Sequence, residues 1–115
     1  MQRTSKSPRK VALEAFEVAQ ATLPAYSHHF SPKKFTQHQL FALLVLKIHQ
    51  RQDYRGVIAL LEDMPLLVRE LGLKAIPHYT TLQKAAERLL GSGGVQPLLS
   101  TTVERFRKKA RARSS

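Results

Sequence analysis

The chain of 115 residues carries 19 Lys and Arg against 8 Asp and Glu, a formal net charge of +11, and 43% of its residues are hydrophobic. This length and apolar content predict one small domain with its own core, without room for a second, catalytic domain. The chain has no cysteine, which excludes disulfides and thiolate metal sites. Its longest apolar run, residues 40–46, is far too short to span a bilayer.

The positive charge is concentrated at the two ends of the chain, and the body between them is nearly balanced. Such an imbalance attracts polyanions, of which nucleic acid is the first to consider, and cationic ends favour arms that hold phosphate groups. The alternative is a pair of ends that only keep the chain soluble. The basic residues of the two ends are Arg3, Lys6, Arg9 and Lys10, and Arg105, Arg107, Lys108, Lys109, Arg111 and Arg113.

Helical periodicity starts directly after the basic N-terminus. Ser7-Pro8 can open a helix, because proline suits a first helical turn, and apolar residues then recur at helical spacing to about Thr22. Leu23-Pro24 ends this helix. Prolines, serines and a His pair make residues 24–35 an ordered connector, whose aromatic residues are expected to pin it to the core.

The next helix is predicted from Thr36 to about Gln52. Thr36 and Gln39 match a capping box, in which each of the two side chains bonds a backbone N–H at the helix start. Apolar residues between Leu40 and Ile48 surround most of this helix instead of forming one stripe, so neighbouring helices must cover it on several sides. We therefore expect it to be the central helix.

Two short helices are predicted next. Asp53 can cap a helix that runs to about Asp63, because a carboxylate at this position accepts an otherwise unpaired helix N–H. Pro65 then suits the first turn of a short helix that ends at Leu71-Gly72, where glycine can adopt the left-handed conformation of a helix end.

The C-terminal third is predicted to hold two more helices. One begins at Thr80 or Thr81 and ends at Leu90, with a Gly-rich break behind it. The last is expected from about Val95 through Phe106, fraying into the basic tail. No segment shows the sustained alternation of a strand, so the predicted fold is an all-α, small multi-helix bundle.

The helices predicted over residues 54–63, 65–71 and 80–90 would make a helix-turn-helix unit that rests on the central helix. In such units the last helix enters the major groove of DNA, where its N-terminal residues meet base edges. Helical spacing turns one side of residues 80–90 to the core, through Leu82, Ala85, Ala86 and Leu89. The opposite side then exposes Thr81, Gln83, Lys84, Glu87 and Arg88.

These exposed side chains have the chemistry of DNA recognition. Gln83 offers a donor and an acceptor suited to adenine, Arg88 can form a forked contact with guanine, and Lys84 can meet guanine or phosphate. Just before the helix, hydroxyls and free N–H groups favour a phosphate oxygen. An ordinary solvated helix face is the alternative, because such a pattern occurs on many helices. The residues that precede the helix or begin it are His78, Tyr79 and Thr80.

A family resemblance runs through the same part of the chain. Residues 24–105, through an ordered set of short motifs, resemble the N-terminal region of insertion-sequence transposases of the DDE superfamily. In that family a helical domain of this kind precedes an RNase-H-like catalytic domain. The resemblance implies binding to the terminal inverted repeats of the element, through exposed residues of segment 77–88. The motifs are Tyr54-Arg55-Gly56, Leu60-Leu61, Pro65-Leu66, Leu71-Gly72-Leu73 and Ile76-Pro77-His78-Tyr79-Thr80-Thr81-Leu82.

The resemblance thus implies a DNA-binding module and no enzyme. The family's three catalytic carboxylates have no counterpart in this chain, so we expect no transposition by the chain alone. The expected organisation is a basic N-terminal arm (residues 1–10), a helical DNA-binding domain (11–104) and a basic C-terminal tail (105–115). We expect a cytoplasmic protein that joins the nucleoid when it binds double-stranded DNA.

Other chemistries find little support among the acids and histidines. The acids fall mostly at helix ends or on polar faces, where capping and charge balance account for them, as at Asp53. His38 and His49 share a helix face but lie about 16 Å apart at the helical rise, too far for one metal ion. Ser27 beside His28 lacks the orienting acid of a triad. We therefore expect no cofactor, no metal site and no small-molecule substrate. Because the basic tail has few apolar anchors, we also expect no membrane partner.

Two other functions stay open. The chain could be an interaction module that pairs with itself or with full-length transposase, as a regulator or an inert remnant, and the apolar helix over residues 40–48 would then find its cover in a second molecule. It could also be one fragment of a split or frameshifted enzyme.

Overall fold

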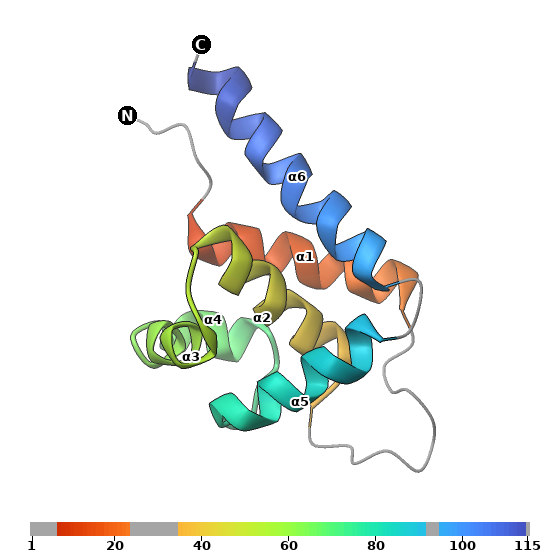
Figure 1. Cartoon of the computed structure of the whole chain (residues 1–115). Coiled ribbons are helices and arrows are strands. Elements are labelled where there is room, and N and C mark those ends of the chain that lie inside the picture. Colours follow the sequence, from red (N-terminus) through yellow and green to blue (C-terminus); the bar gives the residue numbers. More distant parts are fainter. Residues whose placement is uncertain (1–6, 24–34, 92–94, 115) are drawn as a thin grey trace.

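Six helices and no strand make up the part of the chain that the computed structural model describes, which is residues 7–23, 35–91 and 95–114 (Figure 1). The predicted all-α bundle is confirmed. Of the predicted connector, only Phe35 lies among the described residues. The helices are α1 (Pro8–Thr22), α2 (Gln37–His49), α3 (Tyr54–Glu62), α4 (Pro65–Glu70), α5 (Tyr79–Leu90) and α6 (Val95–Ser114).

Helix α2 is the element around which the others pack. Every residue from Leu40 to Leu46 has no more than 4% of its surface exposed. Figure 1 shows α2 in the middle of the bundle, and it contacts α1, α3, α5 and α6. Full burial of one Leu or Phe side chain stabilises the fold by about 1.5–3 kcal/mol, so α2 contributes much of the free energy of folding. The prediction that this helix is central and covered on several sides is confirmed.

The predicted caps of Asp53 and Thr36 form, and Ser7 adds a cap that was not predicted. Ser7 Oγ and Asp53 Oδ1 each accept the backbone N–H three residues further along, at 3.2 and 2.7 Å. In the capping box of α2, Thr36 Oγ1 accepts the N–H of Gln39 at 3.0 Å, and Gln39 Oε1 accepts the N–H of Thr36 at 2.9 Å. The buried Gln39 side chain also donates through Nε2 to the Leu71 carbonyl at 3.0 Å, which ties the start of α2 to the end of α4.

Two helices end in the same type of turn with different residues at its critical position. After α4, the N–H of Leu73 bonds back to the Val68 carbonyl at 3.0 Å, and Gly72 has a φ of 76°. After α2, the equivalent bond measures 2.9 Å, and Arg51 has a φ of 56°. Both are Schellman turns, whose left-handed residue is usually glycine. A side chain in that conformation costs about 1–2 kcal/mol, so Arg51 is strained where Gly72 is not.

Helix α6 is longer than predicted. Leu99, Val103 and Phe106 are buried at helical spacing and anchor its first half. Instead of fraying after Phe106, the helix continues to Ser114, and Figure 1 shows this last part projecting from the bundle. The backbone therefore has no break at residue 105, where the basic tail was expected to begin. Arg, Lys and Ala have high intrinsic helix propensity, which accounts for the continuation.

The strain at Arg51 predicts that glycine at this position stabilises the protein. We expect Arg51→Gly to have a free energy of unfolding about 1 kcal/mol higher than Arg51→Ala, which removes the same charge but keeps a Cβ at the left-handed position. Gly72→Ala should lower it by about 1 kcal/mol, although the added Cβ would lie 3.5 Å from its nearest neighbour, Gln39 Nε2, an ordinary contact. Urea unfolding curves measure both differences. Equal stability of the two Arg51 variants would contradict the strain.

Candidate nucleic-acid interface

Helix α5 turns its two faces in the predicted directions. The core face is no more than 3% exposed at any of the four predicted positions, Leu82, Ala85, Ala86 and Leu89. Helix α5 contacts α2, α3 and α6. The exposed residues of the helix are Thr80, Thr81, Gln83, Lys84, Glu87 and Arg88. The chain therefore presents to solvent the side chains that the sequence assigned to base edges.

Helix α5 begins at Tyr79, slightly earlier than predicted, because His78 is its N-cap. His78 Nδ1 accepts the backbone N–H of Thr80 at 3.2 Å and lies 2.8 Å from the Thr80 hydroxyl oxygen. Histidine is not among the preferred capping residues, so the sequence placed the helix start at Thr80 or Thr81. The N–H of Thr80, which was expected to be free for a phosphate oxygen, is therefore already bonded to His78.

Arg55 lies at the same end of α5, a neighbour that the sequence analysis missed. Its Nη2 donates to the Tyr79 hydroxyl at 2.9 Å, and its Cζ lies 4.5 Å from the centre of the Tyr79 ring. The His78 and Tyr79 ring centroids are also 4.5 Å apart. These contacts hold the beginning of α5 against the beginning of α3. No local pattern could have revealed them, because Arg55 and Tyr79 are 24 residues apart in the chain.

The basic residues of the C-terminal end are carried by α6. Arg105 is exposed, and it lines a pocket together with Glu14 and Glu17 of α1, so acidic groups lie near its charge. The backbone that carries the remaining five is the projecting part of α6 in Figure 1. Their side chains lie outside the described residues: Arg107, Lys108, Lys109, Arg111 and Arg113.

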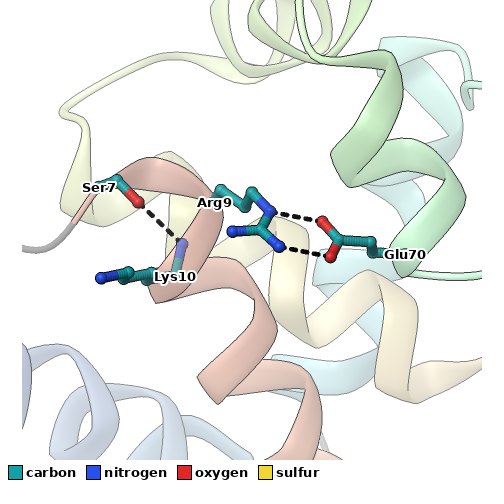
Figure 2. Close-up of polar contacts among 4 residues, drawn as sticks. All are labelled: Ser7, Arg9, Lys10 and Glu70. Carbon is teal, nitrogen blue, oxygen red and sulfur yellow. Dashed lines mark hydrogen bonds and ion pairs between the residues drawn. The ribbon is translucent and has the colours of Figure 1, made fainter.

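The predicted N-terminal arm is partly built into the fold. Arg9 donates through Nε and Nη2 to the two carboxylate oxygens of Glu70, both at 2.6 Å, and so joins α1 to α4 (Figure 2). The Lys10 side chain points away from this pair in Figure 2 and is exposed. Arg3 and Lys6 lie outside the described residues. Arg9 is therefore engaged with a carboxylate, whereas Lys10 presents its charge to solvent.

Pairing changes the acidity of both partners. The hydrogen bond from the Arg9 guanidinium lowers the pKa of Glu70 below its ordinary value, and the same bond raises the pKa of Arg9. A two-pronged Arg–carboxylate contact fixes geometry as well as charge. Because both side chains are partly exposed, the pair orients α4 against α1 more than it stabilises the fold.

The helix-turn-helix assignment stays a prediction. Helix α5 packs against α2 and α3, whereas the main contacts of α4 are with α1 and α3. Residues 71–78 link α4 to α5, a longer connection than the three- or four-residue turn typical of the motif. The exposed helix and its supports are present, but their connection differs from the common pattern.

Within the described residues, no group of three or more His, Cys, Asp or Glu side chains is placed to hold a metal ion. None of the helices searched there combines the length and the apolar character that crossing a bilayer requires.

The ion pair between α1 and α4 predicts a pH-dependent contribution to stability. The folded-state pKa of Glu70 is lowered, so this contribution is complete above the ordinary glutamate pKa of about 4.3 and is lost as the pH falls through the lower, folded-state pKa. Glu70→Gln should therefore reduce Tm at neutral pH, and the difference from the wild type should shrink on acidification. Thermal unfolding across pH measures this. Glu62→Gln, a change at an exposed carboxylate of α3, is the control, and an equal pH dependence in both variants would exclude the pair as its cause.

The cap of α5 predicts a contrast between two substitutions. His78→Ala removes the acceptor of the Thr80 N–H and should destabilise the protein by about 1 kcal/mol. His78→Asn restores a preferred capping side chain and should recover most of that loss. Amide hydrogen exchange in the first turn of α5, measured with urea unfolding, distinguishes them. The same loss in both variants would show that His78 does not act as the cap.

No family model matches the chain, and neither a curated protein nor a solved structure matches it. The transposase resemblance of residues 24–105 consequently stays a prediction.

Proposed function

We propose that the chain is a double-stranded DNA-binding module, the counterpart of the N-terminal part of a DDE-type transposase, in which α5 contacts base edges and the cationic ends contact phosphates. The observation that carries the proposal is the outer face of α5, where Gln83, Lys84 and Arg88 are exposed on a helix whose other side is buried. These are side chains that form paired hydrogen bonds with adenine or guanine in the major groove.

The shape of α5 supports this role. The helix has 12 residues, which gives a length of about 18 Å at the helical rise. The major groove is about 12 Å wide and admits one α-helix. Helices α2, α3 and α6 support α5, whose apolar side is buried. A rigid support favours recognition, because the side chains then lose less conformational freedom on binding.

The contact between α3 and α5 adds a candidate phosphate ligand. Arg55 is exposed, although one of its nitrogens is bonded to Tyr79. A guanidinium has five N–H donors, so several remain for a phosphate oxygen beside the first turn of α5. Because Tyr79 holds the guanidinium in place, Arg55 would reach a phosphate with little loss of side-chain freedom.

Recognition without strand transfer is the activity proposed for this chain. A transposase relative would carry its catalytic carboxylates in a separate RNase-H-like domain, and no residue here is assigned that role. The interaction-module alternative was motivated by an apolar helix in need of an intermolecular cover. In the structure that helix is α2, which the chain itself buries. The proposed location is the cytoplasm, with association to the nucleoid when the module is bound to DNA.

A binding experiment with two kinds of substitution tests the proposal. Selection from a random duplex library should give a preferred sequence, and anisotropy titrations then compare that duplex with unrelated ones. Arg88→Ala should weaken binding to the preferred duplex by about 1–3 kcal/mol while changing the others little. The double variant Lys108→Ala/Lys109→Ala should weaken binding to all duplexes alike. It should also reduce the slope of the logarithm of the binding constant against the logarithm of the salt concentration by about 2 in magnitude.

Arg69→Ala is the matched control for Arg88, because it removes an exposed arginine from α4 instead of α5. It should leave the sequence preference unchanged. No saturable duplex binding at low salt would overturn the proposal. A similar effect of Arg88→Ala on every duplex would retain DNA binding but remove α5 as the reading helix.

A further inference from the structure

A groove lies along one side of α5 and shares Lys84 and Arg88 with the exposed face of this helix. It has a volume of about 310 Å³. One wall is the stripe of Thr81, Lys84 and Arg88, which recur at helical spacing. The floor combines apolar side chains from the central helix, from its N-terminal approach and from the segment that leads into α5. The floor residues are Phe35, Leu40, Ile76 and Pro77. We call this feature the α5 groove.

No carboxylate of the described residues lines the α5 groove beside Lys84 and Arg88. These two are one helical turn apart, a spacing at which like charges destabilise a helix by about 0.2–0.5 kcal/mol, and Glu87, exposed on the same helix but outside the groove, offsets only part of this. Among residues 7–23, 35–91 and 95–114, no ion pair or hydrogen bond joins either side chain to a carboxylate. An anion seated between the two side chains would relieve this repulsion.

The floor of the groove indicates that a bound anion would also have an apolar group. Leu40 and Ile76 also pack in or against the core. Where they and Pro77 line the groove, they offer an apolar surface that a DNA phosphate has no apolar group to cover. A cavity of about 150 Å³ accommodates benzene, and small-ligand pockets begin near 300 Å³. The α5 groove is therefore large enough for one aromatic ring together with an acidic group.

We propose that the α5 groove binds a small aromatic anion, whose ring lies on the apolar floor and whose phosphate or carboxylate group lies between Lys84 and Arg88. Binding of the anion to the groove does not depend on the function proposed above. Its regulatory role does rest on that function: because Lys84 and Arg88 are also the proposed DNA ligands, the bound anion competes with DNA and acts as a release signal. The groove would thus recognise a ligand that has one aromatic ring and one acidic group at a fixed distance from each other.

The test uses the full chain labelled with ¹⁵N and three probes. Phenyl phosphate has both the ring and the acid, inorganic phosphate has the acid alone, and benzyl alcohol has the ring alone. We expect phenyl phosphate to give saturable amide shifts centred on residues 76–88, and to bind at least about tenfold more tightly than either other probe, because each of those lacks one of the two contacts.

Three variants assign the site. Lys84→Ala/Arg88→Ala should weaken phenyl phosphate binding about tenfold or more, whereas Arg69→Ala/Lys74→Ala, which removes two exposed charges outside the groove, should not change it. Ile76→Ala truncates the floor without touching a charge and should weaken binding about fivefold. The ¹⁵N spectrum of each variant checks that it remains folded.

The outcomes separate this proposal from the proposed function. Inorganic phosphate or benzyl alcohol binding as tightly as phenyl phosphate, or equal effects of the two double variants, would overturn the anion site. If the site is occupied, phenyl phosphate should displace a bound duplex at concentrations that match its own Kd. If phenyl phosphate saturates the groove but the chain binds no DNA, the anion site is retained and the DNA-binding function is overturned. If the chain binds DNA but phenyl phosphate does not saturate the groove, the DNA-binding function is retained and the anion site is overturned.

Discussion

The burial of α2 on all sides is the constraint on which the remaining structure depends. A helix that is apolar around most of its circumference cannot lie at a surface, so other helices must surround it. Helices α1, α3, α5 and α6 each contact it, and each keeps its opposite side available for polar residues. The outer face of α5 exists because its inner face is needed to cover α2. The same packing places Leu40 of α2 at the floor of the α5 groove.

Polar contacts between distant residues then set the orientation of the outer helices. Gln39 joins α2 to the end of α4, Arg9 joins α1 to the same helix, and Arg55 joins α3 to the start of α5. The exposed contacts of Arg9 and Arg55 add little net stability, whereas the buried bond of Gln39 contributes about 0.5–1.5 kcal/mol. All three select one arrangement among several that bury similar apolar surface. The candidate interface is positioned by this second class of contact as well as by the core.

Features encoded within one turn of helix were predictable from the sequence, and features that join distant segments were not. The capping box of Thr36 and Gln39 and the two faces of α5 follow from spacing alone, and the structure has them as predicted. The link between Arg9 and Glu70 spans 61 residues and leaves no local pattern. The cap formed by His78 was not predicted for another reason: its ring nitrogen accepts the helix N–H that a hydroxyl or carboxylate oxygen usually accepts. The continuation of α6 beyond Phe106 was not predicted because repulsion among the basic residues was expected to outweigh their high helix propensity.

The continuation of α6 past Phe106 changes what its C-terminal segment can do. A flexible tether samples many positions around its attachment point, whereas a helix works as a stiff spacer whose reach and angular phase are both set by residue number. Each added residue advances a helix by about 1.5 Å and rotates everything beyond it by about 100°. One extra alanine after Phe106 would leave composition and charge nearly untouched, yet would turn the distal segment to another side of the bundle. In this protein the register of the last helix, and not only its charge, therefore sets the direction that the distal segment faces.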